Sequence, residues 1–143
     1  MLSLSDASRV VDEALKTARE MNLPPMTVAV LDARGCLVSF KMEDGSSLLR
    51  EQIARAKAWS SLGMGMGTRT LMSRAAHHPS FFVALSSLAE GSMVPVPGGV
   101  LVRSQEGFVI GAVGVSGDVP DKDEACALAG IRSVNLVADP GVA

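Results

Sequence analysis

The stretch GAVGVSGD, from Gly111 to Asp118, places a hydroxyl and a carboxylate directly after an apolar run. A serine nucleophile on a Gly-x-Ser-x-Gly elbow needs glycine two residues before it and two residues after it. Gly114 meets the first requirement for Ser116, but Asp118 occupies the second position. The glycines are spaced GxxGxxG rather than GxGxxG, and no βαβ pattern surrounds them. We therefore interpret Ser116, Gly117 and Asp118 as the rim of a small-molecule pocket, and not as a hydrolase elbow or a nucleotide site.

Carboxylates crowd the predicted start of the last helix, at Asp118, Asp121, Asp123 and Glu124. Acidic side chains at a helix N-terminus usually satisfy backbone amides and complement the helix dipole, and they would repel a phosphate. The alternative role is that of a general base, for which Asp118 and Glu124 are the candidates. Because capping accounts for all four side chains, we predict no metal site here.

His77 and His78 are the only histidines in the chain. Histidine is the usual axial ligand of haem iron, so either residue is a candidate ligand for haem or a corrinoid. The alternative is an exposed or helix-capping pair just ahead of Pro79, because no cluster of metal ligands lies nearby in the sequence.

A carboxylate-bearing ligand is commonly held by arginine, and Arg50 lies in the predicted central helix. The alternative for this side chain is solvation, or pairing with Glu51. Gly98 and Gly99 end the loop VPVPGG, where a ligand can approach bare backbone. Arg50, Gly98 and Gly99 therefore join the candidate ligand-binding residues.

Composition excludes several classes of function. The chain has 143 residues and a net charge of −2, which does not favour electrostatic binding to nucleic acid or to an anionic membrane. One Trp, four Phe and no Tyr also argue against a base-stacking surface. No apolar run is long enough to cross a membrane, and no signal peptide is recognisable. The two cysteines form no CxxC pair, so we predict a reduced, cytoplasmic protein.

The elements that must position these residues follow from hydrophobic periodicity and turn signals. Two β-hairpins and the helices around them predict a single α+β domain over residues 1–143, with an antiparallel sheet. GMGMG is expected to end the central helix in a loose segment, and ADPGVA to be a frayed tail. The expected helices cover residues 5–21, 47–62 and 123–137, with one or two short helices within 68–91; the expected strands are 26–32, 36–42, 100–103 and 108–115.

Glycine weakens a strand, yet Gly111 and Gly114 lie inside one. Residues three apart in a strand point to opposite faces of the sheet. The structural interpretation is that a helix packs unusually close to the bare backbone or that the strand is bulged. The functional interpretation is that a ligand lies there. Both can hold, one on each face.

The run VPGGVLVRSQEGFVIGAVGVSGDVPDKDEACALAG resembles the C-terminal signature of the GlcG/HbpS family, also called the DUF336 or PduO C-terminal-like domain. VAVLDARGCLVSFKMEDGS and ARAKAWSS extend the resemblance over nearly the whole chain. It implies a profilin-like fold, in which a central antiparallel sheet of about five strands has helices on both faces. It also implies homo-oligomers, of which some bind haem and others accompany corrinoid enzymes. The chain departs from the family pattern at Asp118 and Leu101, close to the expected pocket.

These observations predict a homo-oligomeric small-molecule-binding protein of the GlcG/HbpS type. One alternative is a haem or corrinoid carrier that uses His77 or His78. Another is a catabolic enzyme for a small carboxylate, with an arginine anchor and Asp118 or Glu124 as base. A structural assembly module without a ligand is the third.

Overall fold

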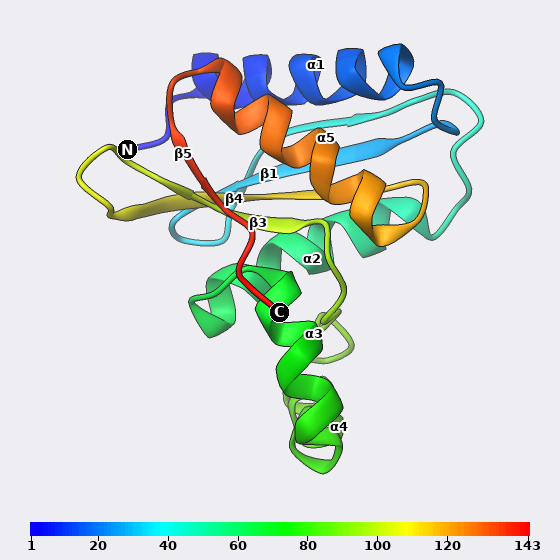
Figure 1. Cartoon of the computed structure of the whole chain (residues 1–143), viewed down its shortest axis with the longest axis vertical. Coiled ribbons are helices and arrows are strands. Elements are labelled where there is room, and N and C mark those ends of the chain that lie inside the picture. The colour runs from blue at the N-terminus through cyan, green and yellow to red at the C-terminus, as the bar shows by residue number, and fades with distance from the viewer.

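A five-stranded antiparallel sheet forms the centre of the computed structural model, which describes residues 1–143 (Figure 1). Its strands are β1 (Thr27–Asp32), β2 (Leu37–Met42), β3 (Gly99–Arg103), β4 (Val109–Ser116) and β5 (Val137–Asp139). They lie in the order β2-β1-β4-β3-β5, so the two hairpins meet where β1 pairs with β4. This arrangement confirms the predicted α+β class with a five-stranded sheet.

Helices cover both faces of the sheet, as predicted (Figure 1). α1 (Leu4–Glu20) and α5 (Pro120–Ser133) lie together on one face, and α2 (Arg50–Met64) lies on the other. α3 (Thr68–His77) and α4 (Pro79–Leu88) project away from the sheet as an arm. No helix combines the length and the apolar character that crossing a membrane requires.

The larger core lies between the sheet and the α1–α5 layer. Ser3 caps the start of α1, because its side chain accepts a hydrogen bond from the Asp6 amide at 3.0 Å. Its apolar stripe meets the valines that alternate along the central strands. The fully buried valines of this core include two from α1 and four from the strands: Val10, Val11, Val28, Val30, Val113 and Val115. On the α2 face a smaller cluster contains Leu31, Ala58, Leu101 and Ala112.

Close helix packing accounts for Gly114. A side chain there would overlap the backbone carbonyl of Ala54 in α2, so the bare strand allows α2 to lie directly on the sheet. Gly111 faces the opposite side, where a side chain would meet Leu2 and the Leu31 carbonyl oxygen. The structural interpretation of the strand glycines is therefore confirmed at Gly114.

Several predicted boundaries were wrong. α2 begins at Arg50 and not at residue 47, and the last helix ends at Ser133 and not at residue 137, where β5 begins. α2 continues through Gly63 to Met64, because it is Gly65, in the left-handed region at φ +70°, that ends the helix. The last helix starts at Pro120, since proline suits the first turn, where an amide donor is not needed. The tail is not frayed: β5 pairs with β3, and Thr70 in α3 exchanges two hydrogen bonds with the backbone of Val142.

Candidate functional site

The Gly98–Gly99 loop is packed against α2 and the start of α3. Gly98 has φ +121°, and a side chain on it would lie 2.8 Å from Lys57 Nζ. A side chain on Gly99 would overlap the Lys57 carbonyl and contact Thr68 at 2.6 Å. The Thr68 hydroxyl accepts from the Gly99 amide at 2.8 Å and lies 3.1 Å from the Gly99 carbonyl oxygen. Protein atoms therefore cover the bare backbone of these two glycines.

A buried ion pair lies beneath this loop. Lys57 Nζ is 3.0 Å from Asp123 Oδ2 and donates to the Val115 carbonyl at 3.0 Å, and both charged side chains are almost fully buried. Desolvation lowers the pKa of Lys57 and raises the pKa of Asp123, and their mutual attraction opposes both shifts. The pair joins α2 to α5 across the end of β4. Because the other Asp123 oxygen accepts from the Asp118 amide at 2.9 Å, the pair also fixes the loop after β4.

Two of the predicted residues come together at the end of β4. Arg50 Nη1 donates to the hydroxyl of Ser116 at 3.1 Å. Gly117 is packed tightly, because a side chain there would overlap the sulfur of Met26. Asp118 is half-buried, and no hydrogen bond or ion pair involves its carboxylate. Arg50 and Ser116, which come from opposite halves of the chain, are thus in contact, and Asp118 follows Ser116 by two residues.

Arg50 differs from the other partly buried arginines. Arg69 and Arg103 each pair with carboxylates, whereas no carboxylate lies within 4.0 Å of the Arg50 guanidinium. Ser116 faces the α2 side of the sheet next to Thr27, its partner in β1. The Thr27 hydroxyl is fully buried and has no hydrogen-bond partner, an arrangement that is costly and uncommon in folded proteins. The cluster of Arg50, Thr27 and Ser116 therefore has spare donors, which suit an anionic group.

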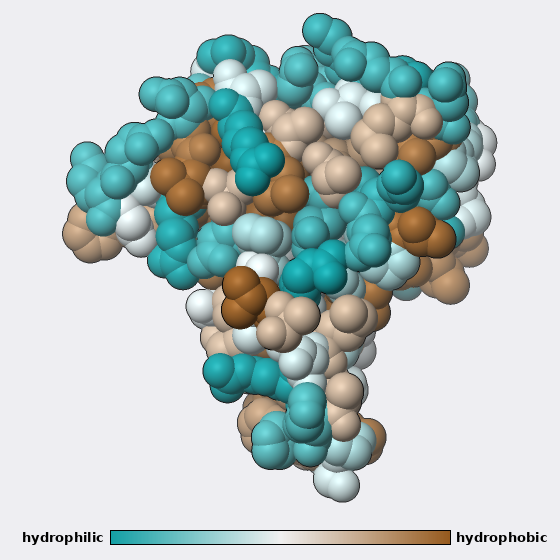
Figure 2. Space-filling view, in the orientation of Figure 1, coloured by the Kyte–Doolittle hydropathy of each residue, from teal (hydrophilic) through white to brown (hydrophobic).

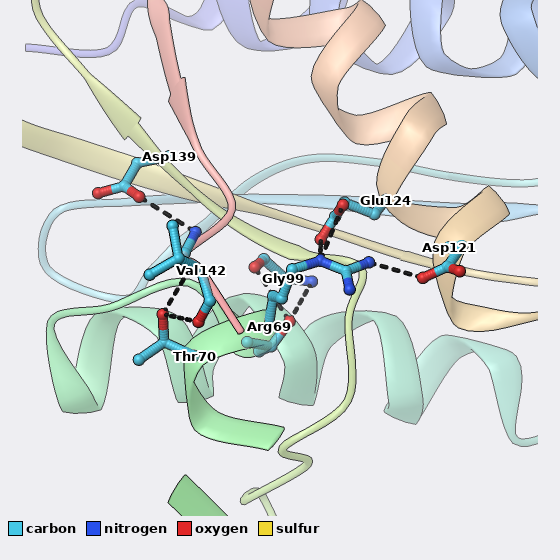
Figure 3. Close-up of polar contacts among 9 residues, drawn as sticks. Arg69, Thr70, Gly99, Asp121, Glu124, Asp139 and Val142 are labelled. Atoms are coloured by element: carbon cyan, nitrogen blue, oxygen red, sulfur yellow. Dashed lines mark hydrogen bonds and ion pairs between the residues drawn. The ribbon is translucent and has the colours of Figure 1, made fainter. Parts of the chain in front are cut away.

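Glu124, the other candidate base, is engaged in an ion-pair network. Figure 3 shows the Arg69 guanidinium pointing from α3 toward α5, where it is 3.0 Å from Glu124 and also pairs with Asp121 at 2.6 Å. These hydrogen bonds raise the pKa of Arg69. The network attaches the base of the arm to α5. It gives Glu124 a structural partner that Asp118 lacks.

The two histidines lie apart from this cluster. His77 ends α3 and His78 precedes α4, and both are exposed. Nδ1 of His77 is 2.8 Å from the Ser73 carbonyl oxygen. Since a carbonyl can only accept, Nδ1 carries the proton and Nε2 is left as a free ligand atom. No group of three or more His, Cys, Asp or Glu side chains is arranged to hold a metal ion.

Sequence reasoning missed Thr27, Thr68 and the pairing of Lys57 with Asp123. Lys57 carried a usable signal, because it stands between Ala56 and Ala58 on a helix whose alanines face the sheet. Thr27 and Thr68 carried none: a threonine at the start of a strand or helix is ordinary, and their roles depend on tertiary contacts.

The comparisons with known proteins agree with this architecture. The family model described as "Haem degrading protein HbpS-like" matches residues 2–132. The chain belongs to the HbpS-like family. The predicted resemblance to the GlcG/HbpS group is thereby confirmed.

Similar solved structures carry the same fold. The PduOC:heme complex superposes with a TM-score of 0.85 at 26% identity, covering 95% of this chain and 96% of that chain. The DUF336 protein ORFY of Klebsiella pneumoniae gives a TM-score of 0.84 at 26% identity, covering 93% of this chain and 90% of its own. HbpS itself gives 0.81 at 25% identity, with coverage of 93% and 89%.

Among curated proteins, the corrinoid adenosyltransferase PduO of Citrobacter freundii is 28% identical over 136 residues. The PduO of Salmonella typhimurium gives the same identity and length. The match covers 94% of this chain and 39% of each PduO protein. This HbpS-like chain thus spans about two fifths of the length of the curated relatives that it matches.

Proposed function

We propose that this HbpS-like chain is a homo-oligomeric protein that binds a carboxylate-bearing small molecule, with haem as the leading ligand. The observation that carries the proposal is the unpaired, half-buried Arg50 beside the buried Thr27 hydroxyl and the Ser116 hydroxyl. A carboxylate placed there would accept charge-assisted hydrogen bonds, which are about twice as strong as neutral ones.

The chemical groups of haem match the hydrogen-bond donors of Arg50, Thr27 and Ser116. Its propionates are carboxylates, and apolar side chains flank the anchor along the chain: Leu48 and Leu49 precede Arg50, and Val119 follows Asp118, all of them exposed. His77, with Nε2 free, and His78 are the candidate iron ligands on this chain, and both lie apart from the Arg50 cluster. The heme complex of the structurally similar PduOC supports haem over other carboxylates.

The test is a hemin titration followed by the Soret band, with the oligomer mass measured before and after loading. We expect saturable binding, and Arg50→Gln should weaken it about 10- to 100-fold through the loss of a charge-assisted hydrogen bond. Arg74→Gln is the matched control, because Arg74 is exposed and makes no ion pair. His77→Ala and His78→Ala separate the two iron-ligand candidates, since loss of the ligand shifts the band position. Unchanged hemin affinity in Arg50→Gln would refute the anchor.

A second candidate function is catabolism of a small carboxylate, which the unpaired Asp118 carboxylate favours. Asp118 lies two residues after Ser116, to which Arg50 of α2 donates, so the candidate base follows closely on the residue that contacts the anchoring arginine. Glu124, the other candidate base, is paired with Arg69. Turnover of a small carboxylate that survives both Asp118→Asn and Glu124→Gln would exclude this alternative.

A further inference from the structure

A second cavity, of about 240 Å³, lies on the opposite flank of α2 from the Lys57–Asp123 pair, beside the turn between β1 and β2. Its walls come from three segments: the outer face of α2, the β1 end with its turn, and the loop after α4. The lining residues are Leu31, Gly35, Glu51, Gln52, Arg55, Ala56, Trp59 and Ser92. None of them belongs to the Arg50 cluster, so the cavity is independent of the function proposed above.

Trp59, the only tryptophan, forms part of this cavity and is 39% exposed. Glycines stand on either side of its indole. A side chain on Gly35 would begin 4.0 Å from the five-membered ring, and one on Gly63 would begin 3.7 Å from the six-membered ring. Exposing an indole forfeits the burial of a large apolar surface. In a chain with so few aromatic residues, a half-open indole inside a polar cavity points to a ligand.

The other lining groups define the chemistry of that ligand. Glu51 and Arg55 form a loose pair, 3.7 Å apart, so the lining carries no net charge. The amide of Gln52 and the hydroxyl of Ser92 take part in no side-chain hydrogen bond within the protein. The indole offers a flat apolar face, and the hydrogen-bonding groups around it carry no net charge. A matching ligand is an uncharged ring that has C–H groups on one face and hydroxyl groups at its edge. At about 240 Å³ the cavity is below the range of drug-sized ligand pockets, which favours a ligand the size of one sugar ring.

We propose that the Trp59 cavity binds a monosaccharide in its pyranose form. The C–H face of the sugar stacks on the indole, whose π face is negative and attracts the slightly positive C–H groups. The hydroxyl groups bond with Glu51, Gln52 and Arg55. A ligand with few atoms on an open site gains little binding free energy beyond the cost of its lost translational and rotational freedom. The dissociation constant is therefore expected to be millimolar.

The test is a titration of the intrinsic Trp59 fluorescence with methyl glucopyranoside, methyl galactopyranoside, methyl mannopyranoside and N-acetylglucosamine. At least one should give a saturable change, whereas sorbitol, an open-chain polyol, should give none.

The Gly63→Leu variant fills the space beside the indole and Gln52→Ala removes the amide. We expect each to weaken sugar binding at least fivefold. Phe108→Ala is the control, because Phe108 is an exposed aromatic residue outside the cavity. Circular dichroism verifies the fold of each variant.

Several outcomes would overturn the proposal. One is the absence of a saturable response to all four sugars, and another is an equal response to sorbitol. A sugar response that is identical in Gly63→Leu and Gln52→Ala would place binding elsewhere. A fluorescence change that follows protein concentration instead of sugar concentration would assign the indole to a contact between two copies of this chain. Saturation-transfer NMR on Trp59→Ala gives a second readout: the sugar signals should disappear.

Discussion

At the scale of single residues, Gly114 gives the sharpest stability prediction. Gly114→Ala places a methyl group on the Ala54 carbonyl, and because both the strand and the helix are backbone, neither can yield by a rotamer change. We expect the free energy of unfolding to fall by about 3 kcal/mol, the upper part of the range for overpacked cores, as measured by urea denaturation. Gly63→Ala is the control, since its methyl group meets only ordinary contacts in an exposed helix turn. Equal stability of the two variants would show that α2 can move off the sheet.

The two thiols should differ in reactivity. Cys36 is exposed, while burial raises the pKa of Cys126 from 9.0 to about 11. A thiol-specific reagent at pH 8 to 9 should therefore label one cysteine in the folded chain and two after denaturation. Between about pH 9 and 11 the unfolded chain loses the Cys126 proton while the folded chain retains it, so the stability from this group declines as pH rises across that window. Fast labelling of both thiols in the folded protein at pH 8 would contradict this assignment.

At the scale of elements, the Lys57–Asp123 pair attaches α2 to α5. Lys57→Met leaves the Asp123 carboxylate buried without its partner, and we expect a loss of about 3 to 5 kcal/mol in thermal or urea unfolding. Lys57→Met combined with Asp123→Leu removes both charges and should regain much of that loss. Arg55→Met is the control, because its pair with Glu51 is exposed and contributes little. A double variant as unstable as the single one would mean that the hydrogen bonds to Val115 and Asp118 matter more than the charges.

The elements also show what the sequence could and could not predict. Period-two and period-3.6 patterns located both hairpins and the helices, since apolar side chains must face one core. The sequence analysis missed β5 because this strand has only three residues, too few to show a periodic pattern, and a Pro-Gly pair follows it. Its place in the sheet depends on β3 and on the ion pair of Arg103 with Asp139 at 2.8 Å. Of the candidate site, Arg50 and Ser116 were each singled out from the sequence, but their contact was not predicted, because it depends on how α2 packs against the end of β4. The buried Lys57–Asp123 pair was not predicted either, because no rule of spacing joins residues 66 positions apart.

At the scale of the whole molecule, the arm presents a surface that suits self-association. Phe81, Val83 and Leu88 in α4 are 55%, 73% and 82% exposed. The arm projects from the domain in Figure 1; on the face seen in Figure 2 it carries mixed weakly apolar and hydrophilic residues, with strongly hydrophobic atoms at its upper end and its edges. Water contact with these side chains is unfavourable, and a second copy that covers them removes that cost. The arm is thus the surface that we propose for contact between subunits.

The prediction is that Phe81→Ser combined with Leu88→Ser lowers the oligomer mass without unfolding the subunit. The Phe81 and Leu88 side chains are largely exposed in the isolated chain. The substitutions therefore leave the small core of the arm, formed by Leu71, Phe82 and Met93, intact. Native mass spectrometry and light scattering at several protein concentrations measure the mass, and circular dichroism measures the fold. Phe108→Ser is the control, because Phe108 is equally exposed at 71% but lies at the tip of the β3–β4 hairpin. A mass that changes only in Phe108→Ser would move the interface to that hairpin. If neither variant changes the mass of an oligomeric wild type, the subunits do not meet through the arm.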